Sequence, residues 1–232
     1  MLLDLGTVLG AGGPGSADRA ALRRAVVEDN VLGKRTARTR LASWQRLNRL
    51  YGLSDQAPLN RAFLSLWKSA PEARPQLALL RALERDALLR LSAPWIVAQP
   101  PGQAVTPAAL AAELTRLGVV YSEKTLRSIS QNLLSSWAQV GWLTGKVAKR
   151  RAAVTWHPAA AAFLLYGAYL TGHRGAGLYD TPLAHLLGLD AEQLDALAFA
   201  ASQERLLSYR RLADVVEITF PGWDADDSRG PA

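Results

Sequence analysis

The segment Tyr121–Trp156, YSEKTLRSISQNLLSSWAQVGWLTGKVAKRRAAVTW, predicts a helix followed by a short β-hairpin. Ser122 has the side chain of an N-cap residue, whose hydroxyl can accept a hydrogen bond from a first-turn N–H. Apolar residues then recur every three or four positions, which is the spacing of a buried helix face. They are Leu126, Ile129, Leu133, Trp137 and Val140. The segment therefore begins with an amphipathic helix.

The opposite face of this helix is polar and almost free of acidic residues. At 100° per residue, Lys124, Ser128, Gln131 and Ser135 fall on that face, and Arg127 lies at its flank. Arg and Lys can contact guanine in a DNA major groove, and Gln can contact adenine. The alternative interpretation is an ordinary solvated helix face.

The hairpin that follows carries a concentration of basic residues. We expect two strands, residues 142–144 and 152–156, around a tip at residues 145–151. The tip would hold Lys146, Lys149, Arg150 and Arg151. A helix followed by a basic two-stranded flap is the order of parts in a winged-helix nucleic-acid-binding unit. We therefore predict a mainly α fold with winged-helix-like units carrying short β-hairpins.

Positive charge is concentrated in two blocks. The chain has 27 Lys and Arg against 20 Asp and Glu, a net charge of +7. Residues 18–51 hold nine basic and three acidic side chains, and residues 121–156 hold six and one. Residues 181–227 hold three and nine. Clustered positive charge is what a protein needs to neutralise a phosphate backbone.

The first basic block predicts a helical hairpin. One helix is expected over residues 17–27, and a second from Thr36 to Tyr51, closed by Gly52. Its predicted buried stripe is Ala37, Leu41, Trp44, Leu47 and Leu50. Lys34, Arg35, Arg38 and Arg49 would lie near its start or on its outer face. Cations at a helix start oppose the macrodipole, so a bound anion would relieve that cost. Solubilising arginines are an equally good interpretation.

Composition shifts divide the chain into five parts. We predict a disordered leader (1–16), an N-terminal helical domain (17–98), a winged-helix-like unit (104–157), a helix with a second such unit (158–220) and a disordered acidic tail (221–232). One helix is expected over residues 75–91. The second unit would present Glu192, Asp195 and Glu204, so we expect it to pack or to bind protein.

Several classes of protein are disfavoured by composition. Cysteine is absent, and His157, His173 and His185 lack metal-ligand spacing, so no metal or cofactor is expected. No nucleophile, base and orienting group stand at a recognisable spacing, which argues against an enzyme. The longest apolar run, residues 159–170, is too short to cross a bilayer and predicts a buried helix. We expect a cytoplasmic protein without a membrane partner.

Three pieces of the chain together resemble a known family. They are VVEDNVLGKRTARTRL (26–41), SEKTLRSISQNLLSSWAQVGWLTG (122–145) and SYRRLADVVEI (208–218). In order and spacing the chain resembles BrxA, a component of bacterial BREX phage-defence loci. The family's motif positions correspond to Asn30, Lys34, Arg35, Thr36, Arg38, Thr39, Ser122, Thr125 and Trp137. Some family descriptions use the label putative membrane protein, for which this sequence offers no spanning segment.

The resemblance implies a mostly helical bacterial protein without catalytic activity that helps a multi-protein system to restrict unmodified phage DNA. Together with the basic blocks, it predicts a non-catalytic binder of double-stranded DNA. Two alternatives stay open. The family has been likened to NusB-type RNA-binding factors, and the same basic helices could meet an A-form backbone. A scaffold subunit that docks other BREX proteins is the second alternative.

Overall fold

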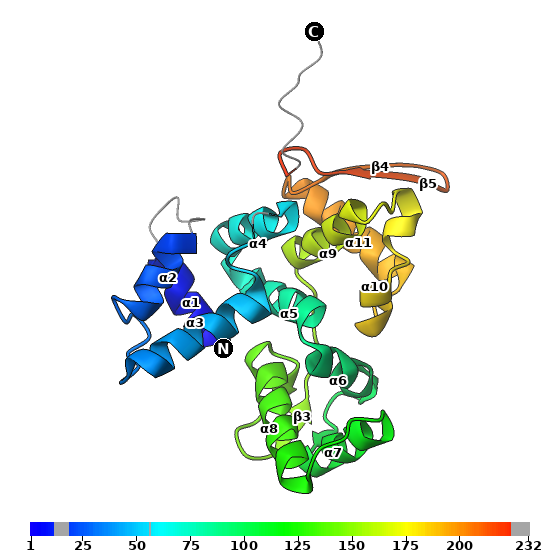
Figure 1. The fold of residues 1–232 in the computed structure, drawn as a ribbon. Helices are drawn as coiled ribbons and strands as arrows, with labels where there is room; N and C mark the ends of the chain where they lie inside the picture. Colours follow the sequence, from blue (N-terminus) through cyan, green and yellow to red (C-terminus); the bar gives the residue numbers. More distant parts are fainter. Residues whose placement is uncertain (12–18, 56, 224–232) are drawn as a thin grey trace.

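A computed structural model describes residues 1–11, 19–55 and 57–223, and this part of the chain is mainly helical (Figure 1). The mainly α fold is therefore confirmed. The α-helices are α1 (Leu2–Ala11), α2 (Arg19–Val27), α3 (Ala37–Tyr51), α4 (Pro58–Ser69), α5 (Arg74–Arg85), α6 (Ala87–Ala98), α7 (Pro107–Arg116), α8 (Glu123–Gln139), α9 (Pro158–Leu170), α10 (Pro182–Leu186) and α11 (Ala191–Gln203). The 3₁₀ turns are η1 (Pro71–Ala73) and η2 (Gly175–Leu178). The strands are β1 (Ala104–Val105), β2 (Leu143–Thr144), β3 (Lys149–Arg151), β4 (Ser208–Leu212) and β5 (Val215–Thr219).

The chain opens with a packed helix, so the prediction of a disordered leader is wrong for residues 2–11. Leu5 and Val8 of α1, three residues apart on one helix face, are fully buried, and α1 packs on α2. Asp4 also accepts a hydrogen bond from Lys34 Nζ at 3.1 Å. The apolar residues at helical spacing thus favour a helix in this segment, although it also contains glycines. Residues 12–16 of the predicted leader lie outside the described residues.

Helix α3 has the expected ends but a narrower buried face than predicted. The Thr36 hydroxyl accepts from Thr39 N, and Gly52 closes the helix with φ 64°. Trp44 and Leu47 are buried, whereas Ala37 is exposed and Leu41 is 39% exposed. Because α3 packs on α2 and α5, residues in its first turns lie at the edge of that contact.

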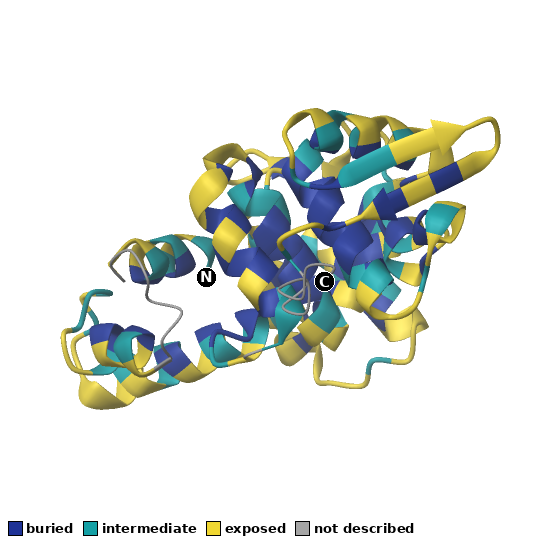
Figure 2. Cartoon of the chain, turned by 90° about the horizontal axis from the view of Figure 1, so that it is seen from above, coloured by how far each residue is buried: buried dark blue, intermediate teal, exposed yellow. Residues whose placement is uncertain are grey.

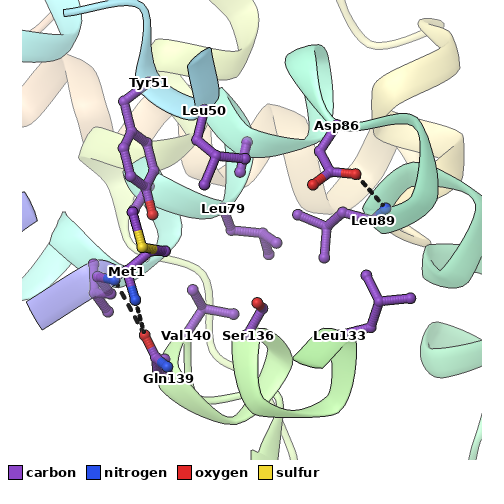
Figure 3. A pocket seen from close by; sticks show the side chains of 13 residues that line it. Met1, Leu50, Tyr51, Leu79, Asp86, Leu89, Leu133, Ser136, Gln139 and Val140 are labelled. Atoms are coloured by element: carbon purple, nitrogen blue, oxygen red, sulfur yellow. Dashed lines mark hydrogen bonds between the residues drawn. The ribbon is translucent and has the colours of Figure 1, made fainter. Parts of the chain in front are cut away.

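The helix predicted over residues 75–91 is two helices. At Asp86 the backbone is extended, and its carboxylate caps α6 by accepting from Leu88 N and Leu89 N at 3.0 Å each (Figure 3). Aspartate favours an N-cap over a helix interior because its side chain competes for backbone N–H groups. Leu91, the last residue of the predicted helix, is exposed on α6.

Helix α6 begins a unit that we call the central unit, residues 87–157. Its elements run α6, β1, α7, α8, β2 and β3, and the three strands form an antiparallel sheet in the order β1-β3-β2. Helix α6 packs on both α7 and α8. The predicted boundary between residues 98 and 104 places α6 in the N-terminal domain. It would therefore separate α6 from α7 and α8, on which it packs.

The strand positions differ from those predicted. Lys149–Arg151 forms the central strand, in which Arg150 lies opposite both Ala104 and Thr144. Residues 152–156, predicted as a strand, form no ladder. Helix α5 holds this segment instead, through Gln76, which donates to Thr155 O at 2.7 Å and accepts from His157 N at 2.8 Å. Strand β1 was not predicted from the sequence, because its two residues are too few to show the alternation of polar and apolar side chains that marks a strand.

The C-terminal unit, residues 158–220, repeats this order of elements in part. Buried helix α9 is followed by η2, α10, α11 and the hairpin β4–β5, and η2 packs on β5. Asp190 and Gln193 form a capping box at the start of α11, and Val216, Ile218 and Phe220 are buried. Figure 2 shows the hairpin with buried residues along β5 and an exposed tip. None of the described helices combines the length and apolar character needed to cross a membrane.

Candidate nucleic-acid interface

Helix α8 presents the polar face predicted from its sequence. Its buried side includes Leu126, Leu133 and Trp137, while Ile129 and Val140 are half-buried. The predicted contact residues all lie exposed on the other side. They are Lys124, Arg127, Ser128 and Gln131. Among the described residues, none of these four side chains has a recorded hydrogen bond or ion pair, so they are free to meet a ligand.

Two contacts hold α8 in place. Trp137 is fully buried, and its Nε1 donates to Ser92 Oγ on α6 at 2.9 Å. At the C-terminal end, Gln139 Oε1 accepts from the backbone nitrogens of Met1 and Leu2 at 3.1 Å each (Figure 3). The first contact fixes α8 within the central unit, and the second ties it to α1. Both contacts lie in the last turn of α8, and α7 also packs on this helix.

A groove runs between α7 and the N-terminal half of α8. It has a volume of about 680 Å³. Its α7 wall is made of small residues, which include Pro107, Ala108, Ala111 and Ala112, and Leu126 adds an apolar surface from α8. Tyr121, Glu123, Arg127 and Gln131 also line it. Tyr121 and Glu123 were not among the predicted site residues, although an exposed aromatic side chain beside a polar helix face was a usable signal.

The hairpin tip is less basic than predicted, because the strands lie elsewhere. The turn from Gly145 to Ala148 contains a single basic residue, Lys146, beside the exposed Val147. Gly145 has φ 90°, and a Cβ there would collide with the carbonyl oxygen of Ala148. The tight turn therefore requires glycine at this position.

The three basic residues of β3 differ in exposure: Arg150 lies on one face of the strand, and Lys149 and Arg151 lie on the other. Arg150 is exposed and donates to Gly102 O at 2.9 Å. Arg151 is half-buried, with Cζ 4.4 Å from the centre of the Trp142 ring, and it donates to Ile96 O at 3.1 Å and to Ala152 O. Burial lowers the pKa of its guanidinium. These contacts direct two of its donors to the interior, which disfavours the phosphate contact predicted for Arg151. Lys149 is also half-buried.

The N-terminal basic block lies on α2, α3 and the loop between them, at the left of Figure 1, whereas α8 lies at the bottom beside α7. Lys34 is paired with Asp4, and its backbone N–H donates to Asn30 Oδ1 at 2.8 Å. Arg35, Arg38 and Arg49 are exposed. Several positions that carry the family resemblance thus have structural roles here: Asn30 shapes a turn, Thr36 and Ser122 cap helices, and Trp137 fills the core.

Asp195 of the C-terminal unit is not the exposed acid that the sequence predicted. Its Oδ1 accepts from the hydroxyls of Tyr179 and Tyr209 at 2.9 Å each, and its Oδ2 lies 2.6 Å from Arg211 Nη1. Burial, together with the Asp195 carboxylate, raises the pKa of Tyr179. Asp195 therefore joins α11 to β4 and to the segment after η2. Glu192 and Glu204 are exposed, as expected.

Comparison of the chain with protein-family models, with curated proteins and with solved structures found no match in any of the three. In the described part of the chain, no group of three or more His, Asp or Glu side chains is arranged to hold a metal ion.

Proposed function

We propose that this protein is a non-catalytic, cytoplasmic component of a bacterial BREX phage-defence system that binds double-stranded DNA through a winged-helix unit. The BREX assignment is the one suggested by the sequence resemblance to BrxA. The winged-helix assignment is supported by the element order α6-β1-α7-α8-β2-β3 and the sheet order β1-β3-β2. In such units the helix corresponding to α8 enters the major groove and the hairpin contacts the backbone.

One observation carries the proposal: α8 presents four polar or basic side chains on an exposed face, and none of the four has a partner among the described residues. Arg127 and Gln131 would approach base edges, since their donors and acceptors match those exposed in the major groove. Lys124 at the start of α8, with Lys146 and Arg150 on the hairpin, would neutralise phosphates. Arg35, Arg38 and Arg49 would provide a second, separate phosphate contact.

The test is a salt titration of DNA affinity. Replacing both Lys124 and Arg127 by Ala should weaken binding of a labelled 20-base-pair duplex by on the order of tenfold and should flatten the dependence of log Kd on log salt. Fluorescence anisotropy at several salt concentrations measures both. The matched control replaces Arg205 and Arg210, two exposed arginines of the C-terminal unit, and removes the same net charge.

The outcomes separate the rival functions. Equal losses in the two double variants would show that binding depends on net charge and would overturn the assignment of α8. Tighter binding of a structured RNA than of the duplex would favour an RNA-binding factor. No affinity for either nucleic acid at physiological salt would overturn the proposal and favour a scaffold subunit.

A further inference from the structure

The groove between α7 and α8 has a chemical character different from that of the polar face beside it. The face is basic and suits phosphate, whereas the groove has small apolar side chains along α7 and is lined by both a carboxylate, Glu123, and a cation, Arg127. An anionic phosphate would be repelled by that carboxylate and would gain little from alanine side chains. The occupant of the groove must therefore be flat or apolar, with hydrogen-bonding groups at its edge.

The lining residues match an unstacked nucleobase. Tyr121 is 54% exposed, so its ring offers a surface on which a base can stack. Glu123 can accept from an exocyclic amino group, Gln131 can both donate and accept, and Arg127 can donate. These groups meet the Watson–Crick edge of a base that has lost its pairing partner. In a continuous duplex that edge is already occupied.

The groove is also continuous with the proposed DNA surface. Arg127 and Gln131 belong both to the exposed face of α8 and to the lining of the groove. A strand that follows α8 would therefore pass the mouth of the groove. The small side chains of α7 provide the space, because larger residues at Ala108, Ala111 and Ala112 would fill it.

From these observations we infer that the α7–α8 groove binds a single nucleobase turned out of the helix, so that DNA with an unpaired base binds more tightly than a perfect duplex. This inference rests on the proposed DNA-binding function and specifies the substrate of the same surface. Turning a base out of the stack costs least where it is already unpaired. Stacking on Tyr121 then adds to the contacts made by α8.

The experiment compares a perfect duplex with the same duplex carrying a one-nucleotide bulge. The bulged duplex should bind on the order of tenfold more tightly than the perfect duplex, because stacking of one base on an aromatic ring gives an effect of about this size. Ala112→Phe should remove this preference, because the new ring fills the groove, while leaving affinity for the perfect duplex unchanged. Ala109→Phe is the matched control: Ala109 is exposed on the same helix but does not line the groove.

A second readout locates the base directly. With 5-iodouracil at the bulge, irradiation should cross-link the DNA to Tyr121 in the unmodified protein and in Ala109→Phe, and not in Ala112→Phe. Duplex binding without a bulge preference would overturn the inference and leave the proposed function standing. A preference that survives Ala112→Phe would also overturn it. No binding of either DNA would overturn both.

Discussion

The central unit and the C-terminal unit each contain a helix with a side-chain N-cap, α8 and α11. The two helices bury similar faces, but their exposed faces differ in charge. Counted from their N-caps, Ser122 and Asp190, buried positions coincide: Leu126 matches Leu194, and Ser130 matches Ala198. The candidate contact positions do not. Lys124, Arg127, Ser128 and Gln131 correspond to Glu192, Asp195, Ala196 and Phe199.

The two helices thus combine similar buried faces with exposed faces of different charge, and a similar fold need not bind the same ligand. At the position where α8 leaves Arg127 free, α11 uses Asp195 to hold two tyrosines and an arginine of its own unit. Glu192 and the exposed Phe199 make the rest of that face unsuitable for phosphate. Within the proposed function, only the central unit would contact DNA bases.

The largest expected effect on stability concerns positions 127 and 195, which correspond when both helices are counted from their N-caps. Asp195→Ala removes the acceptor of three hydrogen bonds and should lower the free energy of unfolding by about 3 kcal/mol. Arg127→Ala, at an exposed side chain without a partner among the described residues, should change it by less than about 0.5 kcal/mol. Urea denaturation followed by tryptophan fluorescence measures both. Similar effects at the two positions would contradict the contrast between the units.

Charge reversal should have a large effect on duplex binding at α8 and a small effect at α11. Replacing Lys124 and Arg127 by Glu should weaken duplex binding on the order of a hundredfold, because two contacts become repulsive. Glu192→Lys, at the position matching Lys124, should leave affinity within about threefold, since single exposed charges far from the contact contribute little. Anisotropy titrations at one salt concentration give both values. A strong gain from Glu192→Lys would place DNA at α11 also.

Alkaline pH should destabilise the protein through the tyrosine at Asp195. Burial raises the pKa of Tyr179, so the folded protein retains a phenolic proton that the unfolded chain loses near pH 10. This contribution to stability is complete below about pH 10 and is lost as pH rises toward the folded-state pKa. Tyr179→Phe should flatten the fall in unfolding free energy between pH 9 and 11, measured by urea denaturation. The control is Tyr121→Phe, in the central unit.

The smallest expected effect is at the hairpin turn of the central unit. Gly145→Ala should distort the turn, because the new Cβ collides with Ala148, and should weaken duplex binding by about threefold through the displaced Lys146. Gly141→Ala is the matched control, since Gly141 also has positive φ but open space around it. If both variants bind DNA alike, the hairpin makes no important contact.

Local chemistry made much of this fold predictable from sequence. Thr36 and Ser122 marked helix starts through hydroxyls that accept a backbone N–H, and the spacing of Leu126, Leu133 and Trp137 defined the buried side of α8. These signals lie within a few residues of one another, so no tertiary information is needed to interpret them. The exposed polar face of α8 followed from the same periodicity.

Features that depend on long-range contacts were not predictable in this way. Arg151 is turned inward by Trp142 and the carbonyl of Ile96, and Asp195 by Tyr179 and Arg211. A charged residue in a sequence gives no sign of which distant carbonyl or carboxylate will pair with it. The groove beside Tyr121 likewise arises only when α7 packs on α8.

The cap at Asp86 determines how the chain can be dissected. A fragment cut at the proline-rich residues 99–103 would leave Ser92 and the rest of α6 behind, and Trp137 would lose both its hydrogen-bond acceptor and part of its apolar cover. Such a fragment should be aggregation-prone. A fragment beginning at Asp86 retains the capped helix and is the shortest piece of the central unit that we expect to fold.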